Sequence, residues 1–209
     1  MIEQVRFRAA TPDDAAAAVP LIHSSGPAAF EYVFAVSGRG DAQDFLMRAF
    51  IGGAGEFGWR NHCVGELDGR VVATGAGFGG ESTLAFTVAA VRQIFGHYRW
   101  QAPRVIARGL RVERVIQPPV RGMHYLAHFG VMPELRGRGI GGALIAHLVE
   151  QGRAQGKRRM VLDVAASNPQ AQALYQRLGF VVTGERASTL ANAQGTVPAH
   201  RRMERLLSG

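Results

Sequence analysis

The sequence lacks the marks of several large classes of protein. It has one cysteine, Cys63, among 209 residues, so an intramolecular disulfide framework is excluded and a cysteine-based zinc site is nearly excluded. No apolar run approaches the ~18 residues of a membrane span, and Met1 to Arg6 lack the apolar stretch of a secretory signal. Gly-Lys-Ser and Gly-Lys-Thr do not occur, which excludes the P-loop. We therefore expect a soluble, cytoplasmic protein with no membrane partner.

Acidic residues are scarce relative to basic ones. The chain has 16 Asp and Glu against 24 Lys and Arg, a net charge of +8. Such a balance suits nucleic acid, an anionic surface or a polyanionic small ligand. Part of the excess falls in residues 99–121, which hold one glutamate, Glu113, and six arginines: Arg99, Arg104, Arg108, Arg111, Arg114 and Arg121. For each basic cluster taken alone, a solvated face is the simpler interpretation.

Length and apolar content predict one folded domain over residues 1–209. The hydrophobic fraction is 47% and the charged fraction 19%, which disfavours disorder. No segment repeats with a period of roughly 20 to 50 residues, so a solenoid or propeller is disfavoured.

Period and turn signals predict the elements of the first part of the chain. They are a strand at 5–8, a helix from Thr11-Pro12 to His23 that ends at 24–27, a helix at 42–50, and a hairpin of 63–67 and 71–74 around Asp68-Gly69.

A further helix is predicted over residues 82–98. Apolar residues recur in it at helical spacing, and we interpret this stripe as core or as the contact of a symmetric homodimer: Leu84, Val88, Val91, Phe95 and Tyr98. The arginine-rich stretch follows it, broken by Pro118-Pro119. We expect 81–121 to be a helical insertion or cap over a larger sheet.

The last third of the chain is the most regular. A short strand at 125–131 precedes a glycine-containing loop at 133–141, a helix at 142–155 and a strand at 160–164. This order is a βαβ unit, which implies two parallel strands and the α/β class. A helix at 169–178 and a strand from Phe180 follow, and residues 200–206 could pair with that strand.

The glycine loop has the properties of a phosphate site. Glycines at a helix start bring backbone N–H groups and the positive end of the helix dipole to a ligand. Gly137 to Gly142 fit G-x-G-x-x-G, and Asp163 lies about 20 residues further on, as in a dinucleotide-binding fold. Five residues separate Val131 from Gly137, however, and about 45 residues follow Asp163. These lengths disfavour the alternative of an NAD(P)-dependent oxidoreductase.

Two motifs in this region resemble the GNAT superfamily of N-acetyltransferases. Its acetyl-CoA pyrophosphate loop, Gln/Arg-x-x-Gly-x-Gly/Ala, falls on Arg136, Gly139 and Gly141, and its second signature on Asn168-Pro169 and 173–180. The close match covers residues 124–182, and 81–121 matches no family feature. The resemblance implies a mixed, strongly twisted sheet flanked by helices, with two central parallel strands that splay apart to admit the cofactor.

The same resemblance implies roles for individual residues of an acetyl-CoA-dependent acyltransferase (EC 2.3.1.-). The loop holds the pyrophosphate, backbone groups of the preceding strand bind the pantetheine arm and polarise the thioester, and Asn168 flanks that arm. Tyr175 corresponds to the family tyrosine near the sulfur and is the candidate general acid. The implied cofactor-binding set is Phe129, Gly130, Val131, Arg136, Gly137, Arg138, Gly139, Ile140, Gly141, Gly142, Asn168 and Tyr175.

The general base is a separate question, because its identity varies in the family. A histidine titrates in the right range. His124 and His128 lie four apart on the strand that enters the site, and so on one face, and we choose His128 as the base. Glu31 and Glu66 are weaker candidates.

Cys63 is expected to be buried, with His62 pointing to the opposite face, so direct transfer in a ternary complex is favoured over an acyl-cysteine. No metal site is expected.

The acceptor is expected to be a primary amine of a small molecule, amino acid or peptide. A basic enzyme repels polycationic acceptors unless a local acidic pocket overrides its field. Arg138, Lys157 and arginines of 99–121 are candidate contacts for the coenzyme A phosphates. A third class, a basic nucleic-acid-binding module, would need stacking aromatics beside the arginines; Tyr98 and Trp100 lie near, but the helical stripe accounts for Tyr98, so nucleic acid is disfavoured.

Overall fold

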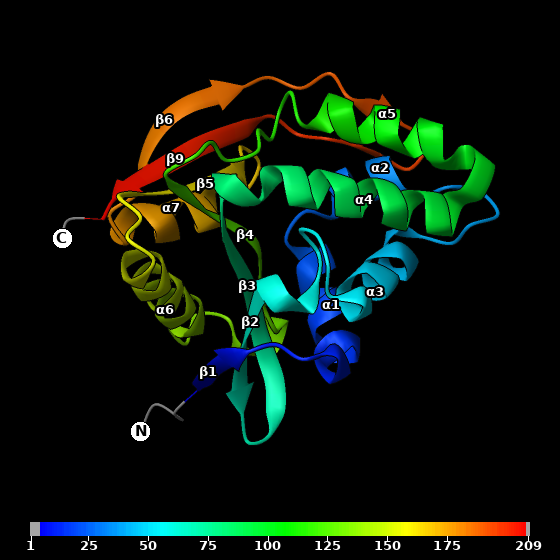
Figure 1. The fold of residues 1–209 in the computed structure, drawn as a ribbon. Coiled ribbons are helices and arrows are strands. Elements are labelled where there is room, and N and C mark those ends of the chain that lie inside the picture. Colours follow the sequence, from blue (N-terminus) through cyan, green and yellow to red (C-terminus); the bar gives the residue numbers. More distant parts are fainter. Residues whose placement is uncertain (1–4, 208–209) are drawn as a thin grey trace.

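The computed structural model describes residues 5–207 and centres on one seven-stranded sheet (Figure 1). The strand order is β1-β2-β3-β4-β5-β9-β6. All neighbours are antiparallel except β4 and β5. The strands are β1 Arg6–Ala9, β2 His62–Leu67, β3 Arg70–Gly79, β4 Met123–Val131, β5 Arg159–Ala165, β6 Val181–Arg186 and β9 His200–Leu206. A separate ribbon joins β7 Ala191–Asn192 and β8 Gly195–Thr196.

The predicted hairpin and the predicted strand pairing at the carboxyl end are both present. Asp68 and Gly69 turn between β2 and β3 with φ of 50° and 74°, the left-handed values that an Asp-Gly hairpin turn requires. Strand β9 pairs with β6, and it also lies between β6 and β5. The mixed α/β class expected from the sequence is therefore confirmed.

Helices cover both faces of the sheet. Figure 1 shows α6 and α7 on one side, and α1, α2 and α3 on the other. The α6 side holds the largest core cluster, which includes Leu144, Ile145, Leu148 and Val149, the apolar face that helical spacing predicts. The helices are α1 Ala15–Ser24, α2 Pro27–Phe34, α3 Ala42–Gly52, α4 Thr83–Tyr98, α5 Ala102–Val112, α6 Ile140–Ala154 and α7 Pro169–Arg177.

Helix α2 is absent from the sequence prediction, because a Gly-Pro pair is compatible both with the end of one helix and with the start of the next. The sequence 24–27 predicts the end of the first helix, whereas Pro27 is the first residue of a new helix. Proline is favoured at that position because its missing N–H would have no partner inside a helix. Tyr32, Val33 and Phe34 of α2 are buried, so packing against the rest of the chain maintains this short helix.

The insertion 81–121 contains α4 and α5, as expected, but the interpretation of the apolar stripe of α4 as core was wrong. The side chains of Leu84, Val88, Val91 and Phe95 are 38 to 77% exposed. Tyr98 alone of the stripe is buried, and its hydroxyl donates to the Phe34 carbonyl at 2.7 Å. The reason is rotational: α4 turns Ile94 and Tyr98 toward a cluster built with α2, α3 and α5, which leaves the other apolar side chains outside.

Helix α5 is amphipathic, with an arginine on its buried face. Ala102, Val105 and Arg108 are its buried residues. The Arg108 guanidinium donates to the Ala35 carbonyl at 3.0 Å, which satisfies the buried donor. This member of the arginine cluster therefore joins α5 to the end of α2, and does not face a ligand.

Candidate active site

The two parallel strands diverge at the centre of the sheet. β4 and β5 pair only from Met123↔Arg159 to Tyr125↔Val161. Beyond this point β4 continues along β3 to Val131, and β5 continues along β9 to Ala165. The backbone edges of 126–131 and 162–165 thus face a widening gap between the two strands. This is the splayed arrangement that the sequence resemblance implies.

A bulge in β4 reorients the strand where the gap begins. Thr74 pairs with Gly130 while Ala76 pairs with Ala127, so β4 has one residue more than β3 between these pairs. His128 lies in this stretch with φ of 57°, a left-handed value that is uncommon for a non-glycine residue. An extra residue shifts the alternation of side chains by one. His124 and His128 therefore lie on opposite faces, and the expectation that they share one face was wrong.

His124 is a buried packing residue on the α6 face. Its ring lies so close to Gly77 that a Cβ there would come within 2.5 Å of Nε2, and a Cβ on Gly152 would contact the ring from α6. Within residues 5–207, neither ring nitrogen has a hydrogen-bond partner. Burial lowers the pKa of His124 to about 4, so the ring is neutral near pH 7. This environment makes it unsuitable as the base.

His128 faces the other side, among aromatic rings and two polar neighbours. It lies 5.0 Å from Phe57 and 6.0 Å from Phe30, measured between ring centroids. Its Nδ1 is 3.2 Å from Nε2 of His62, and its Nε2 is 3.3 Å from Oε1 of Glu56. The His128 side chain is 6% exposed, and that of Glu56 is 42% exposed. This set connects a buried imidazole to a carboxylate that reaches solvent.

The hydrogen bonds in this set fix which nitrogen of each ring carries the proton. The Gly58 carbonyl can only accept, so Nδ1 of His62, at 3.0 Å, is its donor. Burial and the nearby charge of His128 lower the pKa of His62 to about 3, so His62 is neutral and its Nε2 accepts from Nδ1 of His128. Nδ1 of His128 is thus a donor, and its Nε2 is the ring nitrogen that faces Glu56.

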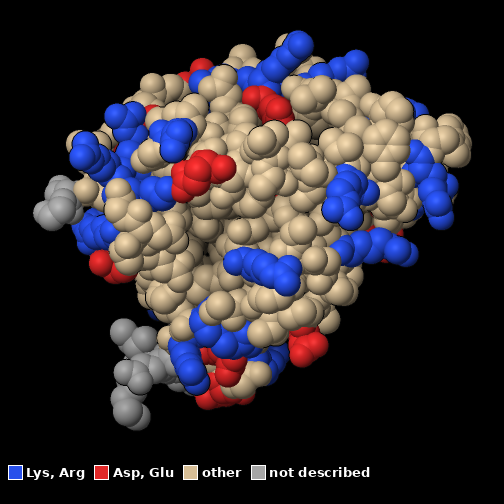
Figure 2. Space-filling view, viewed as in Figure 1, with Lys and Arg blue, Asp and Glu red and all other residues tan. Residues whose placement is uncertain are grey.

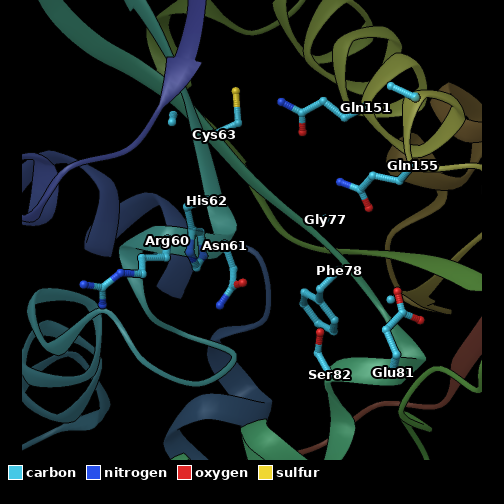
Figure 3. Close-up of a pocket in the computed structure, with 13 residues that line it drawn as sticks. Arg60, Asn61, His62, Cys63, Gly77, Phe78, Glu81, Ser82, Gln151 and Gln155 are labelled. Carbon is cyan, nitrogen blue, oxygen red and sulfur yellow. The ribbon is translucent and has the colours of Figure 1, made fainter.

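Cys63 lies apart from this histidine pair. Figure 3 shows it next to His62 on β2, with its sulfur directed away from His62. It belongs to the core cluster on the α6 side and lines a pocket of about 530 Å³ with Gln151 and Gln155. Burial raises the pKa of the Cys63 thiol to about 11, so it is protonated near pH 7 and a poor nucleophile. Cys63 and His62 do point to opposite faces, as alternation along a strand predicts.

The glycine loop joins the end of β4 to the start of α6. Gly137 and Gly139 have φ of 77° and 83°, and among the described residues no non-neighbouring atom lies within 4 Å of where a Cβ would be on either glycine. Gly139 is the N-cap of α6 and supplies no side-chain cap, so the first N–H groups of the helix have no side-chain acceptor there. The Arg136 Nε donates to the Val131 carbonyl at 3.1 Å. This open cradle fits an anionic group such as a pyrophosphate.

Helix α7 packs near the start of α6. A Cβ on Gly141 would lie 3.6 Å from Leu174 and 3.7 Å from Val131, so the start of α6, the end of β4 and α7 meet. The Asn168 side chain accepts from the Ala171 N–H at 3.0 Å, which makes it the N-cap of α7. Burial raises the pKa of Tyr175, next to Leu174, to about 12, so its hydroxyl is protonated near pH 7.

Several other candidates have structural partners. Glu31 lies 2.8 Å from Nε2 of His23, and Glu66 lies 2.8 Å from Arg8. Lys157 pairs with Glu81 near the carboxyl end of α6, roughly 20 Å of helix away from the glycine loop. Asp163 is buried, accepts from the Tyr125 hydroxyl at 2.8 Å and lies 3.3 Å from Arg202, so it is not placed to bind a ribose.

The structure also bears on nucleic-acid binding, membrane spans and metal sites. On the face in Figure 2, basic side chains lie in separate groups, some at the margin and some across the lower middle, and do not form the continuous stripe that tracks a nucleic-acid backbone. Within residues 5–207 no helix is long and apolar enough to cross a bilayer, and in the same range no group of three His, Cys, Asp or Glu side chains is placed to hold a metal.

A family model identifies the protein class. The model of the acetyltransferase (GNAT) family matches residues 43–180, and the chain belongs to this family. This is a family of acetyl-CoA-dependent acyltransferases, and the family expected from the loop and the second signature is confirmed.

Curated relatives are similar over a shorter stretch. A 5-NmdU N-acetyltransferase of Pseudomonas phage PaMx11 is 41% identical over 71 residues, 34% of this chain and 49% of the relative. The [ribosomal protein bS18]-alanine N-acetyltransferase of Salmonella typhimurium is 37% identical over 70 residues, 34% of this chain and 47% of the relative. The chain thus matches about half the length of these relatives.

Solved structures share the fold over nearly the whole chain. An N-acetyltransferase from Staphylococcus aureus Mu50 has a TM-score of 0.68 at 17% identity, covering 95% of this chain and 99% of the other. The protein yncA of Salmonella typhimurium, solved with its cofactor acetyl-CoA, has a TM-score of 0.57 at 18% identity, covering 99% and 95%. At these identities the likeness shows the fold alone.

Sequence reasoning missed two polar partners of His128. Glu56 belongs to the glycine-rich loop 52–58, which no strand or helix pattern places beside β4. His62 was considered only as the neighbour of Cys63. Its pairing with His128 depends on the register His62↔Ala76 and on the bulge after Ala127, and the local sequence carries no signal for that bulge.

Proposed function

We propose that this chain transfers an acetyl group from acetyl-CoA directly to a primary amine while both substrates are bound. The observation that carries the proposal is a set of residues beside the gap between β4 and β5. Hydrogen bonds join Gly58 to His62 and His62 to His128, and Oε1 of Glu56 lies 3.3 Å from Nε2 of His128. This set leaves a proton-accepting nitrogen and a carboxylate next to the point where the strands separate.

The two groups suit an ammonium substrate. An alkylamine has a pKa of ~10.4 and is mostly protonated at pH 7, so it needs a base before its nitrogen can react. Glu56 attracts the cation, and Nε2 of His128 takes the proton. His62 acts through His128: it holds the Nδ1–H and thereby directs the basic nitrogen outward.

The cofactor would be held by the elements that meet at the glycine loop. The open N-terminus of α6, Gly137 and Gly139 would bind the pyrophosphate, and the unpaired edge of Phe129 to Val131 would bind the pantetheine arm. When bound, acetyl-CoA supplies an activated acetyl group. Backbone N–H groups at that edge would polarise its carbonyl, an effect worth ~3–4 kcal/mol per donor in other enzymes.

Tyr175 is proposed as the general acid. Its pKa of about 12 keeps the hydroxyl protonated, so it can give a proton to a departing thiolate. The protonated state and the position of Cys63 on the α6 face favour direct transfer over an acyl-cysteine. The similar curated proteins are N-acetyltransferases, which supports nitrogen as the acceptor atom.

The test is coenzyme A release with a panel of primary amines. We expect His128→Gln to lower kcat by about 100-fold or more, with calorimetric acetyl-CoA binding unchanged. His147→Gln changes a histidine of α6 that lies outside the site and should keep the wild-type rate. A His128→Gln enzyme as fast as wild type would refute the role of His128. Wild-type protein that binds acetyl-CoA and acetylates no amine would refute the proposed function.

A further inference from the structure

A separate pocket lies on the same face of the sheet as His128. It has a volume of about 170 Å³ and is formed where α4 and the segment after α5 cover β3 and β4. Glu56 belongs to its lining, so the pocket reaches the carboxylate that contacts Nε2 of His128. The insertion 81–121 contributes much of the wall.

The wall of the pocket is largely aromatic. Phe78 of β3 lies 5.1 Å from Phe86 of α4 and 5.7 Å from Tyr125 of β4, measured between ring centroids, and Phe57 completes this side. Such rings pack against alkyl chains and attract cations over their faces. The Tyr125 hydroxyl is already bonded to Asp163, so its ring is what it offers to the pocket.

The charged groups in this lining are two carboxylates. Glu56 lies at the end near His128, and Glu113 lies at an exposed rim next to the end of α5. The other polar side chains of the lining are neutral: Thr83, Thr87, Gln93 and Gln117. Partial burial and the negative charge of Glu56 raise the pKa of Glu113. In a chain of net charge +8, the described residues that line this pocket include two carboxylates and no basic side chain. The nearby Arg186 and Arg202 donate to Gln117.

We propose that the acceptor is a compact diamine, with its reacting amine at Glu56 and His128 and its second ammonium at Glu113. The aromatic walls cover the alkyl chain between them. This inference rests on the proposed function, because it names the substrate of the same reaction. The N–C(acetyl) bond forms as the C–S bond breaks. One proton of the reacting ammonium passes to His128 and on to solvent, and one is delivered to the thiolate.

The first test compares acceptors of equal chain length. Unbranched α,ω-diaminoalkanes are assayed beside the corresponding monoaminoalkanes by coenzyme A release, and we expect a lower KM for the diamines. The Glu113→Gln enzyme should show a KM for the diamines raised about fivefold, as for the loss of an ion pair near a protein surface, with its KM for monoamines unchanged. Glu150→Gln removes a negative charge from exposed α6 and should change neither value.

The variant at Glu113 is suited to this test because it should fold. Glu113 is the C-cap of α5, where a negative charge opposes the helix dipole, so its neutralisation does not weaken the helix. Equal KM values for diamines and monoamines in wild type, or an unchanged diamine KM in Glu113→Gln, would overturn the diamine proposal while the transferase function stands. A wild-type enzyme that acetylates neither series would overturn the proposed function and this inference with it.

Discussion

The buried ring of His124 should make the protein sensitive to mild acid. Its pKa is lowered from the ordinary 6.5 to about 4, so between these values the unfolded chain binds a proton that the folded protein excludes. The stability is therefore complete above pH 6.5 and falls as the pH falls toward 4. At ~1.4 kcal/mol per pH unit, the loss attributable to His124 is about 2 kcal/mol at pH 5 and approaches about 3 kcal/mol near pH 4.

The perturbation that isolates this effect is His124→Leu, which keeps a side chain of similar volume and removes the titrating ring. It also removes two buried nitrogens without partners, so stability at pH 7.5 should not fall by more than about 1 kcal/mol. Urea unfolding at pH 7.5 and pH 5.0 gives both free energies. Met160→Leu, a change at a buried strand neighbour of His124, should retain the full wild-type loss.

The expected result is a loss of stability between pH 7.5 and 5.0 that is about 2 kcal/mol smaller in His124→Leu than in wild type. Equal losses in the two proteins would refute the reasoning, because they would show that the ring takes up its proton in the folded state without penalty.

Three further predictions concern positioning, proton donation and stability. His62→Phe should lower kcat about tenfold or more, because Nδ1 of His128 loses its acceptor and the His128 tautomer is no longer fixed. His62→Gln has an amide oxygen that can accept from Nδ1, so its kcat should be higher than that of His62→Phe. Equal rates for the two variants would contradict a positioning role. Tyr175→Phe should lower kcat about tenfold or more with KM for acetyl-CoA unchanged, and an unchanged kcat would remove Tyr175 as the acid. Arg108→Met should lower the free energy of unfolding by about 1–3 kcal/mol, because it leaves the Ala35 carbonyl unpaired. The control is Arg111→Met on the exposed side of α5, and this variant should lose little stability.

The parts of the fold that the sequence predicts are those that local signals determine. The Asp68-Gly69 turn needs left-handed backbone and has the residues that favour it. Helix α6 follows from a loop rich in glycine and a regular apolar stripe. The resemblance at Arg136, Gly139 and Gly141 named the family because the motif is contiguous in sequence.

The parts that escaped prediction depend on contacts between distant segments. One extra residue near His128 reverses the faces of a strand, and its signal is a register against β3 that single-sequence patterns do not contain. Glu56 reaches His128 from a loop without periodicity. The stripe of α4 has the spacing of a buried face, yet its burial depends on the side that α4 presents to α2 and α5, and Tyr98 is the member that packs there.

The measurement that tests the account most directly is a calorimetric titration of the protein with acetyl-CoA, coenzyme A and NADPH. The account predicts micromolar binding of acetyl-CoA and coenzyme A, none of NADPH, and a loss of at least about tenfold in acetyl-CoA affinity in Gly139→Val. The valine side chain disfavours the left-handed conformation at the start of α6 and fills the open cradle. Binding of NADPH without binding of acetyl-CoA would contradict the account, since the loop would then serve a dinucleotide.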